Sequence, residues 1–366
     1  MSLSHPFRET RTVDFAWHEV TGAVGDSVTV LPIVIAIAVL TELSVALMLI
    51  WFGVFQVVWG LYYGVPLSVE PMKALAALVL AGTVTTGEFL VAGLLLGGVL
   101  VLAGATRTIT RIQRYIGEPV VRGVQFGVAL VLLETGVGLG LEHVLLSGGV
   151  ALVALLAIAG GHGRVTPILV LGVGALVAGL ETGLPSPVIP GAAGLVQFGV
   201  ADLTVPALEA AVGQVAMTVG NAALVTSILL ADYFDRDVSP DRLAGSMGVM
   251  NLAAVPLGGL PMCHGSGGVA GKYAFGARTA GANVILGLGY VVVAIFAVEL
   301  VRAFPMAVLG VLLVGIAGQM AQTAVERTDA YPFVLGVGAL GLLTNLGVAF
   351  LAGALAYQVR ARLESA

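Results

Sequence analysis

The sequence predicts an all-α polytopic membrane protein with a 7+7 inverted-repeat transporter fold, and three observations support this. The chain of 366 residues is 58% hydrophobic and only 10% charged, with a mean hydropathy of +1.04, which is typical of a protein whose main solvent is lipid. A proline-broken element occurs twice, and the basic residues are biased toward one set of connections. The 51 glycines fit helices that pack closely within a membrane.

The repeat is the most informative of these features. Val65-Pro66-Leu67 and Pro71-Met72 return 190 positions later as Val255-Pro256-Leu257 and Pro261-Met262. Two further matches keep the same order, because Gly25-Asp26 corresponds to Gly220-Asn221 and Pro119 to Pro305. A duplicated, proline-interrupted segment in corresponding halves indicates the binding site of a transporter.

Taking roughly 20 apolar residues as a spanning length, each half gives seven segments, the third of them short. The first half, 1–183, opens with a cytoplasmic lead-in at 1–20, and its segments are 24–42, 43–62, 71–82, 87–106, 119–138, 144–160 and 166–183. A proline-containing linker at 184–205 separates the halves. The second half, 206–366, has segments at 206–230, 241–258, 261–275, 279–301, 305–323, 330–345 and 346–360. The last two segments are short enough that they could form a re-entrant pair instead of two full spans.

Because seven is odd, the second repeat enters the membrane from the opposite side, so the repeats are inverted. With both termini in the cytoplasm of a multi-pass protein of the cell membrane, 14 of the 16 basic residues fall inside, as the positive-inside rule requires. These 14 are Arg8, Arg11, Arg107, Arg111, Arg114, Arg122, Arg164, Arg236, Arg242, Lys272, Arg278, Arg327, Arg360 and Arg362. Lys272 and Arg278 are interpreted as marking the cytoplasmic boundary.

The substrate site is expected where the two short segments begin. Unpaired amides at a helix start carry roughly +0.5 elementary charge and attract anions. Lys73 adds a full positive charge after Pro71, and the second start is a small, polar, glycine-rich turn. The two helix starts and Lys73 together provide a charge of roughly +2, which suits a divalent tetrahedral oxyanion. The predicted binding residues are Pro71, Met72, Lys73, Met262, Cys263, His264, Gly265 and Ser266.

Several of these residues have a second interpretation. Lys73 could form a structural ion pair with Glu70, and Asp26 could cap the first helix. His264 could be a packing histidine with its nitrogens satisfied, Cys263 a small buried filler, and Met72 and Met262 packing residues beside the cavity. Glu134 could be structural or could line a gate. Asn221, the repeat partner of Asp26, is uncharged, so a symmetric two-carboxylate mechanism is not available.

Other classes of protein fit less well. One cysteine excludes an intramolecular disulfide, no Cys/His group has metal-site spacing, and no phosphate loop or nucleophile–base pair occurs. We therefore expect no cofactor, no metal and no enzymatic activity. The net charge of −5 and the scattered basic residues argue against nucleic acid. The expected partners are the oxyanion, a co-transported proton and the bilayer. The protein could also form a homodimer.

The residues at the repeats also resemble a known family. The runs 21–31 (TGAVGDSVTVL), 69–77 (VEPMKALAA) and 260–280 (LPMCHGSGGVAGKYAFGARTA) are similar to signatures of the molybdate transporters related to the sulfate permease (SulP) family. The resemblance implies that segments 1–4 and 8–11 form a substrate-carrying core and the others a gate. It also implies that the anion binds between the starts of segments 3 and 10. Unlike many sulfate permeases, this chain is expected to have no soluble regulatory domain.

The resulting functional prediction is a secondary transporter that takes up molybdate by alternating access. A sulfate or bicarbonate carrier or an anion channel on the same fold, and an oxyanion-binding receptor or scaffold without transport, are the alternatives. Asp26 or Glu70 is predicted to carry a coupled proton. Either carboxylate would be held ionised near positive charge and pushed toward protonation when a dianion arrives.

Overall fold

A computed structural model describes residues 13–163, 165–183, 186–187 and 195–364. Within these ranges the first half contains α1 (Trp17–Leu40), α2 (Val45–Tyr63), β1 (Val69–Pro71), α3 (Lys73–Leu80), α4 (Thr86–Ala105), α5 (Ile109–Ile116), α6 (Glu118–Leu141), α7 (Val144–Ala159) and α8 (Thr166–Thr182). Residues 184–185 and 188–194 of the predicted linker lie outside the described residues. What is described of it ends in a short 3-10 helix, η2 (Val200–Asp202).

The second half repeats this order with small changes. It contains α9 (Val205–Met217), the π-helix η3 (Thr218–Val225), α10 (Thr226–Phe234), α11 (Pro240–Ala254), η4 (Val255–Leu257), β2 (Met262–His264), α12 (Ser266–Ala274), α13 (Gly281–Phe296), α14 (Val298–Arg302), α15 (Met306–Glu326), α16 (Tyr331–Leu343) and α17 (Leu346–Glu364). Six helices of the described chain are long and apolar enough to cross a membrane, counting α9, η3 and α10 as one.

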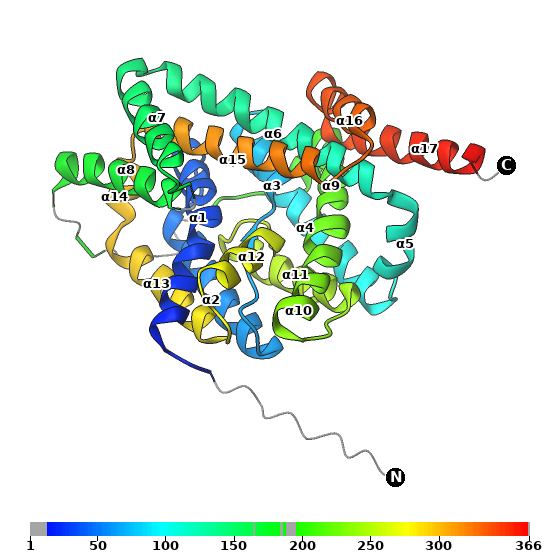
Figure 1. Cartoon of the computed structure of the whole chain (residues 1–366), viewed down its shortest axis with the longest axis horizontal. Helices are drawn as coiled ribbons and strands as arrows, with labels where there is room; N and C mark the ends of the chain where they lie inside the picture. Colours follow the sequence, from blue (N-terminus) through cyan, green and yellow to red (C-terminus); the bar gives the residue numbers. More distant parts are fainter. Residues whose placement is uncertain (1–12, 164, 184–185, 188–194, 365–366) are drawn as a thin grey trace, which may run out of the picture.

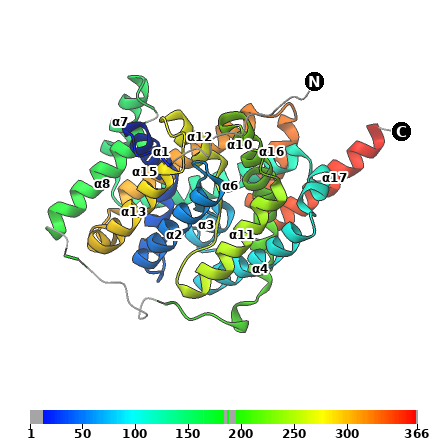
Figure 2. The ribbon, with the colours of Figure 1, turned by 90° about the horizontal axis from the view of Figure 1, so that it is seen from below.

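The two halves interleave rather than fold apart. Helix α2 packs on α13, α4 on α11, α6 on α15, α1 on α12 and α3 on α9, so each of these pairs joins a first-half helix to a second-half helix. In Figure 1, α6, α15 and α16 lie together along one side of the molecule, and α2, α10 and α13 lie on the opposite side. The turned view keeps α7 and α8 at one end and α17 at the other, with α3 between them (Figure 2).

Glycine permits two of these helix pairs to approach closely. A Cβ on Gly53 of α2 would lie 2.6 Å from the carbonyl oxygen of Gly287 in α13, and the reverse substitution would meet Gly53 at the same distance. Gly136 of α6 and Gly310 of α15 form a second reciprocal contact. Backbone-to-backbone packing of this kind is how helices associate in lipid, so the expectation drawn from the glycine content is met at these crossings.

Helix ends follow local chemistry. Helix α4 begins with a capping box, in which Thr85 accepts from the amide of Glu88 and Glu88 accepts from the amide of Thr85. Helix α2 ends at Gly64, which adopts a left-handed conformation with φ of 67°. The described ends of α4 and α15 lie within a few residues of the predicted ones.

Other boundaries differ from the predictions for identifiable reasons. Helix α1 begins at Trp17, ahead of the predicted segment 24–42. The polar start of this helix is held by Glu19, whose carboxylate accepts from the amides of Arg278, Thr279 and Ala282. Asp26 therefore lies inside α1 and does not cap it. The predicted segment 279–301 breaks at Ala297 into α13 and α14.

Candidate functional site

The duplicated proline elements meet as a two-stranded antiparallel ribbon. Strand β1 pairs with β2 in the register Val69–His264, Glu70–Cys263 and Pro71–Met262. The amide of Met72 extends the ribbon by donating to the carbonyl of Pro261 at 2.9 Å. Pro71 and Pro261 favour an extended backbone here, and each strand leads directly into a short helix, α3 or α12.

Two amide side chains bond to the outer edges of this ribbon. Gln56 of α2 donates to the carbonyl of Val69 at 3.1 Å. Asn251 of α11 donates to the carbonyl of Met262 and accepts from its amide, at 2.7 and 2.8 Å. Backbone groups buried at membrane depth must find partners within the protein, so these two side chains allow an extended segment to exist between the helices.

The amides at both short-helix starts point at side-chain oxygens. In α3, the amides of Ala74 and Leu75 donate to Gln214 Oε1 of α9 at 3.0 and 3.3 Å. In α12, the amide of Gly268 donates to Glu70 Oε1 at 2.6 Å. Both starts therefore bind an oxygen acceptor, as expected from their positive dipole ends, and in this conformation the acceptors belong to the chain itself.

Lys73 and Glu70 form an ion pair at this junction. Lys73 Nζ lies 2.6 Å from Glu70 Oε2, and the lysine side chain is 18% exposed while the glutamate is 1% exposed. The structural pairing considered for Lys73 is thus present. Because an ammonium can exchange one anionic partner for another, the pair does not contradict a substrate role for Lys73, which stays a prediction.

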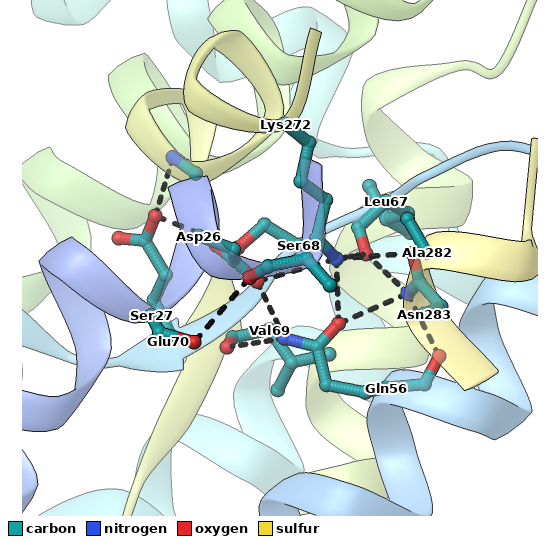
Figure 3. A network of polar contacts seen from close by, with 12 residues as sticks. Asp26, Ser27, Gln56, Leu67, Ser68, Val69, Glu70, Lys272, Ala282 and Asn283 are labelled. Atoms are coloured by element: carbon teal, nitrogen blue, oxygen red, sulfur yellow. Dashed lines mark hydrogen bonds and ion pairs between the residues drawn. The ribbon is translucent and has the colours of Figure 1, made fainter. Parts of the chain in front are cut away.

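A second, deeper ion pair joins α1 to α12. Asp26 Oδ2 lies 3.2 Å from Lys272 Nζ and accepts from Gln56 Nε2 at 2.8 Å, while Asp26 Oδ1 accepts from Ser68 at 2.6 Å. Lys272 also donates to Gln56 Oε1, the carbonyl of Leu67 and Asn283 Oδ1, at 2.8 to 3.0 Å. Figure 3 shows these groups converging from α1, α2, α12 and α13.

Lys272 is therefore placed differently from the prediction. It is fully buried, so it does not mark the cytoplasmic boundary and does not count toward the charge bias used for orientation. The boundary interpretation depends on the two basic residues near the end of the short segment, Lys272 within it and Arg278 just after it. A signal for the correct placement existed, because an intramembrane carboxylate such as Asp26 requires a partner and Lys272 is the single basic residue of the predicted short segment 261–275.

The remaining predicted residues line the same junction at different depths. Both ring nitrogens of His264 are engaged, with Ser246 Oγ at 2.8 Å and the carbonyl of Ser68 at 3.1 Å. Ser266 donates to Asn221 Oδ1 at 2.7 Å, which links the start of α12 to the π-helix η3. Met72, Met262 and Cys263 are buried, with the Cys263 thiol 3.8 Å from the carbonyl of Pro71.

One cavity adjoins this region through Asn221, and a second lies at the far end of α3. One of about 190 Å³ lies between η3 and the start of α6 and is lined by Asn221, Gly220, Arg122 and Glu118 among others. Another of about 350 Å³ is lined by Glu134, Glu209 and Asn345. Glu134 thus borders a cavity, as its gate-lining interpretation requires, and the π-helix places Asn221 beside the first of them.

The glycines of α12 are required by this packing. A Cβ on Gly268 would overlap Asp26 Oδ1, Ser68 Oγ and Glu70 Oε1, and one on Gly265 would overlap the Glu70 carboxyl group. We expect Gly268→Ala to lower the free energy of unfolding by about 1–3 kcal/mol, as overpacked substitutions do. Gly98→Ala in α4 is the matched control, because a Cβ there meets nothing within 4 Å, and thermal unfolding of both purified variants provides the comparison.

Equal melting temperatures for these two glycine variants would contradict the packing described around Gly268.

Comparison with known proteins identifies the family. A family model described as "Molybdate transporter of MFS superfamily" matches residues 18–132 and 206–320. The chain belongs to this molybdate transporter family. It is 30% identical over 352 residues to molybdate transporter 2 of Arabidopsis thaliana, covering 81% of this chain and 76% of that protein. It is 25% identical to molybdate transporter 1 of Chlamydomonas reinhardtii, covering 100% and 96%.

Solved structures agree on the fold. The transmembrane domain of the cyanobacterial bicarbonate transporter BicA superposes with a TM-score of 0.68 at 17% identity, covering 92% of this chain and 97% of that domain. Murine Solute Carrier 26 family member A9, an anion transporter in the inward-facing state, gives 0.68 at 12% identity, covering 97% and 69%. The chain therefore has the 7+7 inverted-repeat fold, and the predicted fold class and family resemblance are confirmed.

Proposed function

We propose that this protein takes up molybdate across the cell membrane as a secondary transporter working by alternating access. Its relatives in a plant and an alga are molybdate transporters, and its fold is that of anion transporters. These comparisons favour molybdate over sulfate or bicarbonate and favour transport over enzymatic or receptor activity. The basic residues of the predicted cytoplasmic connections support an orientation with both termini inside.

The observation that carries this proposal is the meeting of two short-helix starts beside Lys73. Strands β1 and β2 hold the starts of α3 and α12 together in the middle of the chain's fold. Lys73 is the first residue of α3, and its side chain is partly exposed. A tetrahedral dianion at this junction would receive an ammonium and the amides of a helix start, which together match its charge.

Flux in proteoliposomes tests the proposal directly. We expect saturable uptake of labelled molybdate with counterflow, inhibited strongly by tungstate and molybdate and less by sulfate. Counterflow separates a carrier from a channel, and net flux separates a carrier from a receptor. Preferred transport of sulfate would reassign the substrate, whereas binding without flux would replace transport by a receptor role.

We further propose that uptake is proton-assisted. Moving a dianion into a negative interior costs about 4.6 kcal/mol per 100 mV, from about 2.3 kcal/mol per elementary charge. A proton carried with the anion offsets half of this cost. Asp26 and Glu70 are the two carboxylates buried at the junction, which makes them the candidates for carrying it.

The corresponding prediction is that uptake accelerates when the outside of the liposomes is acidified at fixed voltage. The reason is that protonating a buried carboxylate removes a negative charge that opposes the arriving dianion. Voltage is clamped with potassium and valinomycin, and uptake is compared with and without a pH gradient. If the unmutated protein takes up molybdate at the same rate with and without the pH gradient, proton coupling is ruled out.

A further inference from the structure

The Glu70 carboxylate is bound in the way an oxyanion substrate would be. Its Oε2 receives Lys73 Nζ at 2.6 Å, and its Oε1 receives the amide of Gly268 at 2.6 Å from the first turn of α12. The hydroxyls of Thr29 and Ser68 approach Oε1 at 3.4 and 3.5 Å. An ammonium, a helix-start amide and hydroxyl groups are the donors that bind carboxylate and tetrahedral oxyanions alike.

These donors include the groups that the proposed function assigns to molybdate. A dianion approaching Lys73 meets the negative charge of Glu70 at close range, in surroundings of low dielectric where repulsion is strong. Binding is therefore favourable only when the glutamate loses its charge or leaves its donors. Protonation at Oε2 achieves the first of these, because a carboxylic acid no longer attracts the ammonium as a carboxylate does.

We propose, as an inference that rests on the proposed function, that Glu70 is a tethered competitor of the substrate and the carboxylate that carries the coupled proton. In the empty site ionised Glu70 holds Lys73 and the start of α12. When a proton binds Glu70 Oε2, the Lys73 ammonium is released to the incoming anion. When the anion leaves, the proton leaves as well and Glu70 returns to its donors, so proton and anion move together.

Asp26 is unsuited to this exchange because its charge is already compensated. Its Oδ2 faces Lys272 and Gln56, its Oδ1 accepts from Ser68, and both Asp26 and Lys272 are fully buried. Lys73, by contrast, has Glu70 as its ion-pair partner and is partly exposed. A ligand that arrives from water therefore reaches the Lys73–Glu70 pair before the deeper one.

The other titratable groups around Glu70 do not replace it. Cys263 lies opposite Glu70 in the ribbon and is a buried thiol. His264 follows on β2, and its two nitrogens are occupied by Ser68 and Ser246. Asp26 from α1 and Lys272 from α12 contribute opposite charges that face each other. Glu70 and Lys73 are therefore the groups whose charge or pairing changes when the substrate binds.

Molybdate binding to the purified full-length protein tests this inference, measured by calorimetry between pH 6 and pH 8. In the unmutated protein the affinity should rise by about tenfold for each unit of falling pH, as linkage to one proton requires. Glu70→Gln should bind molybdate at least about tenfold more tightly at pH 8 and lose this pH dependence, because it has no charge to remove. Asp26→Asn is the matched control and should keep the slope.

Each outcome is informative. Glu70→Asp, which keeps a titrating group on a shorter side chain, should retain the slope, and it serves as the folded comparison if Glu70→Gln proves unstable. Equal affinity and equal slope in Glu70→Gln and the unmutated protein would overturn the inference. A slope lost in Asp26→Asn but kept in Glu70→Gln would overturn it as well. Absence of molybdate binding in all of these proteins would instead overturn the proposed function.

Discussion

Replacing Lys73 by alanine is expected to abolish measurable molybdate binding and uptake while the protein remains folded. Lys73 provides the full positive charge at the start of α3 and is paired only through its contact with Glu70 in the described site. Its loss leaves a buried carboxylate where a dianion must bind, so repulsion replaces attraction. Binding by calorimetry and uptake in proteoliposomes measure the effect.

Two companions make the Lys73 result interpretable. Lys73→Arg keeps the charge and should retain part of the affinity, although its planar guanidinium fits a different geometry. His264→Ala should reduce affinity less than Lys73→Ala, since both histidine nitrogens bond to the protein and a neutral donor contributes less than an ionic one. Unchanged affinity in Lys73→Ala, or a larger loss in His264→Ala, would indicate instead that the substrate binds mainly at β2 and α12.

Replacing Lys272 by methionine is expected to lower the free energy of unfolding by about 3–5 kcal/mol, because it leaves Asp26 as an uncompensated charge in the interior. Methionine preserves most of the side-chain volume, so the effect reports charge and hydrogen bonding rather than a cavity. The side-chain oxygen of Asn283 also loses the ammonium as a donor, whereas the carbonyl of Leu67 and Gln56 Oε1 lose the ammonium but still accept from Asn283 Nδ2. Thermal unfolding in detergent measures the change.

The double variant Asp26→Asn with Lys272→Met is the control for this second prediction. Removing both charges eliminates the uncompensated carboxylate, so the double variant should be more stable than Lys272→Met alone. If the single variant melts at the temperature of the unmutated protein, the buried pair contributes nothing to stability. If the double variant is the less stable of the two, the loss comes from hydrogen bonds rather than from charge.

Much of the fold could be predicted because lipid imposes simple constraints on a sequence. A spanning helix requires a long apolar run, and a proline-broken element repeated 190 positions later shows that the layout is duplicated. These constraints are local or periodic, so they are visible in a single sequence. They predict the segment order, the short third members and the meeting of the two proline-broken elements, in which Pro71 pairs with Met262.

Helix boundaries were predicted less well where polar residues serve the interior. The polarity of the start of α1 predicts a cytoplasmic lead-in, yet Glu19 is buried and accepts from three backbone amides more than 250 positions away. Asp26 was considered a helix cap, yet it lies within α1. Polarity is a good indicator of the membrane boundary only when the polar group faces water.

Composition, spacing and motif are enough to predict the membrane class, the repeat and the family from one sequence. The pairing of charges depends on packing: Lys73 lies against Glu70, and Lys272 pairs with Asp26 across 246 positions. Glu70 and Lys73 are three residues apart, so their pairing was foreseeable. For Asp26 the sequence indicates that a buried carboxylate requires a partner, but only the packing of α1 against α12 identifies that partner as the fully buried Lys272.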